Sequence, residues 1–380
     1  MFGVILKVQH AEHGKPFALA NYNERGRKLE MTTYVLGAGA SRDAGYPLAK
    51  TMASELLQWM KRPTHDPDSY AARYPATAHF LEESFAPVEN VEDLVTAIHK
   101  LIDEYENGTR EQRAKRTLVA NEYGVFKNAV RAWFAEIQQG VALASSAYQG
   151  FARSIVVPGD CIVTFNYDVS LDRELRLAGK LEIGDGYGFP IESLPGKSPT
   201  KMLKLHGSTS WLALLFGGRT SGFFQFQPGS TLGARPVIGK NELSFLGYAD
   251  AADPAFGEGG AALPVMIFPA RSKDFYFASN TGIEYAEFWN DLWQQAAAAL
   301  QSAARVVICG YSLLPVDERA RTLLLNAPKK DAEIVVASGE DTERIVREYR
   351  EAGYARAMAA EDVLFQRWVA RLTNSVTAIR

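Results

Sequence analysis

The segment Gly37-Ala38-Gly39-Ala40-Ser41 ends an apolar run with two glycines and small side chains. A glycine turn between a strand and a helix lets the backbone approach a phosphate group, whose charge is favourable at a helix N-terminus. Arg42 stands where a dinucleotide-binding fingerprint has its third glycine. The segment therefore predicts either a phosphate-binding turn or a plain strand–helix turn, and it argues against an ordinary dehydrogenase.

Asn166 and Asp168 stand two positions apart in the stretch TFNYD, which begins at Thr164 and closes a second apolar run. An amide can orient water or a sugar hydroxyl without adding charge, and a carboxylate can bind a donor or a developing cation. Short polar side chains at strand ends also form turns that satisfy their own backbone. Both interpretations stay open on the sequence alone.

His206 lies in the stretch KLHGSTSW and is the only histidine after residue 99. Imidazole is the side chain whose ordinary pKa suits a general base near neutral pH. If this half of the chain needs such a base, His206 is the only imidazole present. The alternative is a buried histidine with a structural role at a turn.

Gly310, Ser312 and Asp317 follow a fourth apolar run in VICGYSLLPVDERA. Glycine and serine can pack against a ribose or a phosphate. They can equally form a tight strand–helix turn in which Asp317 is the N-cap.

The elements that must position these residues are short apolar runs, most of them β-branched and ending in polar residues or glycine. Such runs are typical of buried parallel strands, and ligands bind beyond the carboxyl ends of those strands. The predicted strands are 32–36, 160–168, 202–208, 305–312 and 333–339. We therefore expect an α/β protein with a Rossmann-like parallel sheet.

Helical patterns occupy much of the remaining sequence, with apolar residues recurring on one face. The predicted helices are 47–60, 91–105 and 123–137. The last two belong to a predicted helical insertion, 61–154, and the Gly- and Phe-rich segment 213–262 is predicted to be a lid or hairpin insertion.

Three regions follow from this division of the chain: an N-terminal extension, a Rossmann-like domain that contains both insertions, and a C-terminal tail helix. Their predicted boundaries are 1–30, 31–360 and 361–380.

The composition indicates a globular protein with 22% charged residues and a net charge of −3, so nothing suggests nucleic acid or an anionic membrane as partner. The basic run 110–116 is predicted to be a solvated helix face. The two cysteines lie in apolar runs, which favours buried free thiols and a cytoplasmic location. Two cysteines cannot form a four-cysteine zinc site, and no metal is expected.

Together and in this order, GAGAS, TFNYD, LHGS and GYSL resemble the motifs of the sirtuin-like superfamily. The closest resemblance is to the bacterial sirtuin-like NAD hydrolases of antiviral defence, and it covers about residues 31–353. The resemblance implies NAD as substrate, with Asn166, His206 and Asp168 as catalytic residues. The residues it implies for NAD binding are Gly37, Ala38, Gly39, Ala40, Ser41, Thr164, Gly310 and Ser312.

Two departures from the protein-deacylating sirtuins bear on the activity. Those enzymes carry a zinc module with paired C-x-x-C motifs, and their helix begins Gly-Ile-Pro-Asp-Phe-Arg, where this chain has GYPLAK at 45–50. Both departures favour water over an acyl-lysine as the acceptor. We therefore expect hydrolysis of NAD to nicotinamide and ADP-ribose, and the alternatives are a non-catalytic NAD or ADP-ribose sensor and an NAD-dependent deacylase.

An enzyme that consumes NAD must be restrained in its host. A homo-oligomeric resting state, with 61–154 and 213–262 as contact surfaces, is therefore expected. The resemblance also implies a possible separate ATPase or helicase partner in defence.

Overall fold

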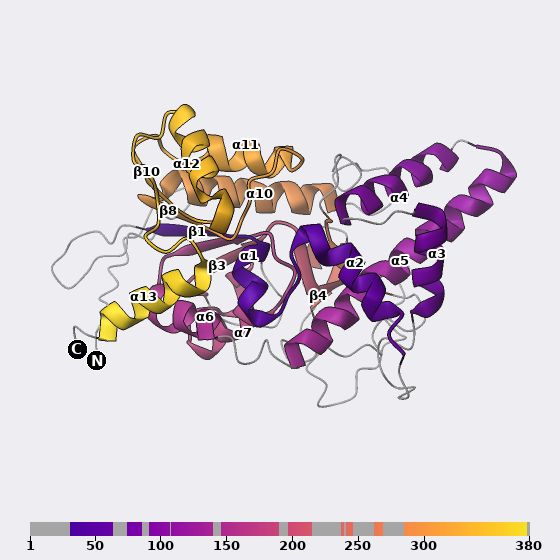
Figure 1. Cartoon of the computed structure of the whole chain (residues 1–380), viewed down its shortest axis with the longest axis horizontal. Coiled ribbons are helices and arrows are strands. Elements are labelled where there is room, and N and C mark those ends of the chain that lie inside the picture. Colours follow the sequence, from indigo (N-terminus) through magenta and orange to yellow (C-terminus); the bar gives the residue numbers. More distant parts are fainter. Residues whose placement is uncertain are drawn as a thin grey trace.

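The computed structural model describes most of the chain between residues 31 and 377 (Figure 1). The described segments are 31–63, 74–85, 91–106, 108–139, 146–189, 197–214, 237–238, 241–245, 262–268 and 285–377. The predicted N-terminal extension lies outside them, as does most of the predicted insertion 213–262.

A six-stranded sheet lies at the centre of the fold, and each pair of neighbouring strands in it is parallel. The strand order is β10-β9-β8-β1-β2-β3. When the six strands are numbered by their order along the chain, this order reads 6-5-4-1-2-3. It is the Rossmann arrangement, in which the first strand is central and the strand order reverses beside it. The predicted α/β class is therefore confirmed. The strands are β1 (Thr32–Leu36), β2 (Cys161–Thr164), β3 (Lys201–Lys204), β8 (Arg305–Cys309), β9 (Glu333–Ala337) and β10 (Ala357–Ala359).

The central residues of these strands are apolar because helices cover both faces of the sheet. Val35, Val163 and Ile308 are fully buried on three neighbouring strands. In Figure 1, α10 (Tyr285–Ser302), α11 (Glu318–Asn326) and α12 (Thr342–Glu351) lie over one face. On the other face lie α6 (Ser146–Gly150), α7 (Ser170–Leu177) and α13 (Phe365–Thr377).

The register of the sheet brings the carboxyl ends of its strands to one level. Leu36 at the end of β1 pairs with Thr164 of β2 on one side and with Cys309 of β8 on the other. Thr164 pairs in turn with Lys204 of β3, and Cys309 pairs with Ala337 of β9. The residues that follow these five strands therefore meet at a single edge.

Helices α3, α4 and α5, which lie between β1 and β2 in the chain, form a lobe beside the sheet, on the right in Figure 1. Its long helices contact one another and α2. The described helices before β2 are α1 (Ala38–Ser41), η1 (Arg42–Ala44), α2 (Ala49–Met60), α3 (Pro75–Phe85), α4 (Val91–Glu106), α5 (Arg110–Gln139), α6 and the π-helical turn η4 (Phe151–Ile155). No described helix has the length and apolar character needed to cross a membrane.

A second sheet is antiparallel and has the order β5-β6-β4-β7. Its strands are β4 (Gly207–Leu214), β5 (Val237–Ile238), β6 (Asn241–Phe245) and β7 (Ala262–Met266). The sequence predicted one strand over 202–208, which is wrong, because β3 ends at Lys204 and β4 begins at Gly207 in a different sheet. Gly207 has φ +83°, and a Cβ there would lie 2.0 Å from the Val265 carbonyl oxygen. The chain turns here, at the position of His206.

Other elements also differ from their predicted bounds. The strands predicted over 160–168, 305–312 and 333–339 end earlier, at Thr164, Cys309 and Ala337, and the helix predicted over 123–137 is part of the longer α5. The helix expected over 47–60 begins at Ala49, with Leu48 as its extended N-cap residue. The short helix α8 (Ile183–Gly186) and the strand β10 were not predicted. The C-terminal helix α13 buries Phe365, Trp368 and Val369 and packs on α6 and η4, so it is an integral part of the core.

Candidate functional site

A cavity of about 1140 Å³ lies at the carboxyl edge of the parallel sheet. All four sequence motifs contribute to it. The predicted site residues that line it are Ala38, Gly39, Ser41, Asn166, Asp168, His206, Gly310 and Ser312. Gly37, Ala40 and Thr164, also predicted, do not line it and lie behind its wall.

Thr164 supports the cavity from behind. Its Oγ1 donates to the Leu36 carbonyl at 3.2 Å and accepts from the Asn166 backbone N–H at 3.1 Å. These two bonds fix the turn that carries Asn166 out of β2.

The two glycine turns pack directly against each other. The Gly39 N–H donates to the Gly310 carbonyl at 2.8 Å, and the Gly37 N–H donates to the Cys309 carbonyl at 3.0 Å. A Cβ on Gly39 would lie 2.8 Å from the Gly310 Cα. Gly310 has φ +62°, and a Cβ there would lie 2.2 Å from the Ala40 nitrogen. These glycines are therefore required for contact between the β1 and β8 turns, a reason that the sequence alone did not reveal.

Asn166 is held by both N–H groups of its amide. Nδ2 donates to the Gly37 carbonyl at 2.9 Å and to the Ser41 Oγ at 2.8 Å. Because a backbone carbonyl only accepts, this contact fixes which side-chain atom is the nitrogen. With its nitrogen engaged, the amide can offer only its Oδ1 acceptor to a ligand.

Ser41 connects Asn166 to two buried groups. Its Oγ donates to Asp168 Oδ2 at 2.7 Å and lies 2.6 Å from the Tyr148 hydroxyl. Burial raises the pKa of Tyr148 well above its ordinary value, and the Asp168 charge raises it further. The phenol therefore stays protonated and donates to Ser41. Tyr148 comes from the helical insertion, and its spacing in the sequence gave no sign of this contact.

Asp168 uses both carboxylate oxygens within the protein. Oδ2 accepts from Ser41, and Oδ1 accepts from the Ser170 backbone N–H at 3.1 Å. Burial raises the pKa of Asp168, while the Lys204 charge and the Ser41 hydrogen bond act in the opposite direction. In this arrangement Asp168 orients Ser41 and, through it, the Asn166 amide.

A buried ion pair lies beneath this network. Lys204 and Asp172 have fully buried side chains, and Lys204 Nζ lies 3.0 Å from Asp172 Oδ2. Lys204 also donates to the Asp168 backbone carbonyl at 2.6 Å. Tyr187 completes the cluster by donating to Asp172 Oδ1 at 2.6 Å. The pair anchors the segment that follows β2 to the end of β3.

His206 is buried and packed between aromatic rings. Phe165 meets it edge to face, with ring centroids 5.0 Å apart, and Tyr167 lies nearly parallel to it at 6.4 Å. Its Nε2 lies 3.3 Å from Asp317 Oδ2. The sequence did not predict this pairing, because the two residues belong to motifs that are distant along the chain.

Asp317 confirms the N-cap alternative for the fourth motif. Its Oδ1 accepts from the Ala320 N–H at 3.2 Å, at the start of α11. Its Oδ2 accepts from the Tyr311 hydroxyl at 3.2 Å as well as facing His206. Asp317 thus caps α11 through one carboxylate oxygen and faces the cavity residue His206 with the other.

The loop before Asp317 is held from behind by arginines. Arg344 donates to the Ser312 carbonyl, and Arg321 donates to the Leu313 carbonyl at 3.3 Å. Both arginines pair with Glu348, at 2.7 Å and 2.5 Å. Leu313 has φ +50°, an uncommon value for a residue with a side chain. The arginine pair therefore stabilises a strained loop, whose residues Ser312 and Leu314 line the cavity.

The rim of the cavity carries charge of both signs. Arg42 and Lys50 are the basic residues that line it among the described residues. Glu340 and Asp341 also line the cavity, and sequence reasoning did not identify them. Lys50 and Glu340 are 3.9 Å apart, but both are exposed, so this pair contributes little stability.

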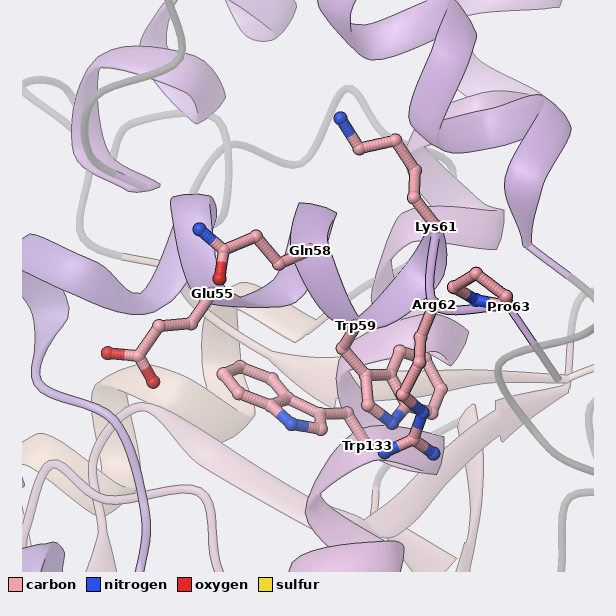
Figure 2. Close-up of a pocket in the computed structure, with 7 residues that line it drawn as sticks. All are labelled: Glu55, Gln58, Trp59, Lys61, Arg62, Pro63 and Trp133. Carbon is pink, nitrogen blue, oxygen red and sulfur yellow. The ribbon is translucent and has the colours of Figure 1, made fainter.

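A second hollow, of about 600 Å³, lies on α2 and α5 and contains none of the predicted site residues (Figure 2). Trp59 donates to Glu136 at 3.0 Å, and Arg62 pairs with the same carboxylate at 2.9 Å. Lys61 points away from the two tryptophans. This hollow lacks the converging polar groups of the larger cavity. Within the described ranges, no group of three or more His, Cys, Asp or Glu side chains is arranged to hold a metal ion.

Comparison with known proteins gives matches among solved structures only. No family model matches the chain, and no curated protein matches it. A crystal structure described as a Sir2 homolog–NAD complex aligns with 11% identity over 91% of this chain and 90% of that chain, with a TM-score of 0.38. A structure from work on the mechanism and regulation of Sir2 enzymes aligns with 12% identity over 92% and 94%, with a TM-score of 0.37. TM-scores this low carry no inference about function, and the fold is defined by the strand order and register above.

Proposed function

We propose that this protein hydrolyses NAD at the bond between nicotinamide and ribose, releasing nicotinamide and ADP-ribose. One observation carries the proposal. Asn166 and His206, at the ends of β2 and β3, line the same cavity as the glycine turn that follows β1. The ordered resemblance of the four motifs to sirtuin-like NAD hydrolases supplies the substrate and the reaction.

The chemistry fits the side chains that meet in the cavity. Nicotinamide carries a positive charge on its ring nitrogen in NAD, and it leaves as a neutral molecule with the electron pair of the broken C–N bond. Water forms the new bond to the ribose carbon and loses a proton. His206 takes that proton as general base, and the Asn166 Oδ1 orients the water or a ribose hydroxyl.

The turn after β1 suits the pyrophosphate of a dinucleotide. Gly39 brings the backbone to the cavity surface without a side chain, and Arg42 lies directly after Ser41 in a lining that also carries acidic side chains. We assign the pyrophosphate to the region of Gly39 and Ser41. Ser312, on the β8 side, is assigned to the adenosine half.

The direct test is to incubate the pure protein with NAD and measure nicotinamide by chromatography. Asn166→Ala and His206→Ala should each slow release at least ~10²-fold, the effect expected for an orienting group or a general base. His79→Ala and Asn290→Ala are matched controls, since both residues are exposed and neither lines the cavity. Parental rates in both site variants, with normal folding, would contradict the site assignment.

Two other outcomes identify the alternative functions. A non-catalytic sensor would bind NAD or ADP-ribose by calorimetry, release no nicotinamide, and keep its affinity in His206→Ala. A deacylase would release nicotinamide only when an acylated peptide is present. Neither alternative is favoured by a feature of the cavity over hydrolysis.

The biological role we propose is that of a regulated effector of bacterial antiphage defence, in the cytoplasm. The resting form would be a homo-oligomer, with a possible separate ATPase or helicase partner, because uncontrolled hydrolysis of NAD harms the host. Light scattering coupled to size exclusion tests this at micromolar concentration, where a stable monomer would contradict the oligomer. Infected cells should lose NAD with the parent protein and retain it with His206→Ala.

A further inference from the structure

We propose that Asp317 is the positioning residue for His206: it fixes the proton of the neutral imidazole on Nε2 and stabilises the ring when it becomes charged. The inference rests on the proposed function in giving His206 its role as base. Its structural basis is the 3.3 Å separation of His206 Nε2 and Asp317 Oδ2. Both side chains are almost fully buried, at 4% and 8% exposure.

The two carboxylate oxygens of Asp317 have separate partners. Oδ1 accepts from the Ala320 N–H and so caps α11, while Oδ2 faces His206 and accepts from the Tyr311 hydroxyl. Capping alone does not require a carboxylate, since Asn and Ser cap helices about as well as Asp. A buried charge is costly unless donors surround it. The Tyr311 hydroxyl and the Ala320 N–H are two such donors, and the His206 Nε2 lies 3.3 Å from Oδ2.

The contact determines the protonation of the ring. An ionised carboxylate only accepts hydrogen bonds, so the His206 nitrogen that faces it must carry a hydrogen. In the neutral ring that hydrogen lies on Nε2, and the lone pair is therefore on Nδ1. Phe165 and Tyr167 hold the ring plane from two sides, so the orientation is fixed as well.

This arrangement suits proton transfer during hydrolysis. Nδ1 accepts the proton that the attacking water loses, and the ring becomes an imidazolium. The Asp317 carboxylate beside Nε2 then stabilises the new positive charge, as an opposite charge at close range does. Asp317 does not need to touch NAD for this effect, so it is a positioning residue.

The decisive variant is Asp317→Asn. An asparagine can still cap α11 through its Oδ1, but its Nδ2 then faces His206 and presents donors where an acceptor is needed. We expect kcat for nicotinamide release to fall at least ~10²-fold, with little change in KM. Asp317→Ser, which also caps, should behave in the same way. Glu318→Gln is the matched control, because it removes an exposed charge one residue away.

A second readout does not depend on NAD hydrolysis. Long-range ¹⁵N–¹H NMR of protein labelled in histidine reports which ring nitrogen carries the hydrogen, and His206→Ala identifies the signal among the six histidines. At alkaline pH we expect hydrogen on Nε2 in the parent and a move to Nδ1 in Asp317→Asn. Circular dichroism confirms that each variant is folded.

The outcomes separate the two proposals. Hydrogen on Nδ1 in the parent, or an unchanged tautomer and kcat in Asp317→Asn, would overturn the role of Asp317. If no form releases nicotinamide but the tautomer moves as expected, the pairing stands and the hydrolase function fails.

Discussion

The buried pair of Lys204 and Asp172 offers a quantitative test of how the site is supported. Replacing Lys204 by Met removes the cation and leaves Asp172 in a fully buried position, where Tyr187 is its other hydrogen-bond donor. Breaking a buried pair by removing one partner costs about 3–5 kcal/mol, because it leaves an uncompensated charge. A domain is stable by only about 5–15 kcal/mol. Lys204→Met should therefore lose a large part of its free energy of unfolding.

Urea denaturation followed by circular dichroism measures this change, and a double variant separates charge from packing. Lys204→Met with Asp172→Leu removes both charges, and the replacement of a buried pair by apolar residues is often close to neutral. We expect the double variant to recover most of the lost stability. It should still hydrolyse NAD more slowly than the parent, since the Asp168 carbonyl has lost the Lys204 donor at 2.6 Å. A loss below about 1 kcal/mol in Lys204→Met would refute the reasoning, because that is the scale of an exposed pair.

Two further predictions concern backbone geometry and charge burial. Gly310→Ala should lower both the free energy of unfolding and the NAD affinity, because its Cβ would lie 2.2 Å from the Ala40 nitrogen. Gly179→Ala is the control, since Gly179 has a similar φ of +66° but no atom lies within 4 Å of the added Cβ. Urea denaturation of this control should show only the backbone strain of about 1 kcal/mol. Equal losses in the two glycine variants would contradict the packing argument. Burial lowers the pKa of Lys127 to about 8 from 10.5. Between pH 8 and pH 10.5 the unfolded chain therefore binds more protons than the folded chain. The free energy of unfolding of the parent rises with pH across this range. Lys127→Met should therefore have a higher free energy of unfolding than the parent below pH 8, and the difference should shrink towards pH 10.5. Denaturant titrations across this pH range measure it. A difference in unfolding free energy that stays constant with pH would contradict the lowered pKa of Lys127.

Much of the sheet could be predicted from the sequence because its signals are local. A β-branched run that stops at a glycine, such as the one before Gly37, identifies both a strand and its carboxyl end. Four of the six parallel strands were found from β-branched runs that end in a glycine or a polar residue, whereas the predicted strand 202–208 joined β3 to the start of β4. The Rossmann topology brings the carboxyl ends of these strands together. The exception is β10, whose three residues Ala357–Ala359 are too short for such a pattern.

The residues that support the site were harder to predict, because their contacts are distant in the sequence. The Tyr148 hydroxyl reaches Ser41 from the helical insertion, and Asp317 reaches His206 from the start of α11. Neither contact leaves a periodic signal. The break at Gly207 was missed for a similar reason, because the glycine is required by the Val265 carbonyl of a strand in the other sheet. Long-range packing decided these positions, and local propensity did not.

The central claim is that Asn166 and His206 act on the same sugar carbon of NAD. The most direct measurement is a structure of His206→Ala with NAD bound, since this variant should retain the substrate. The account predicts the nicotinamide ribose between the Asn166 Oδ1 and the space left by the imidazole, with the pyrophosphate beside Gly39. A nucleotide bound outside this cavity, or bound with its nicotinamide ribose away from Asn166, would contradict it.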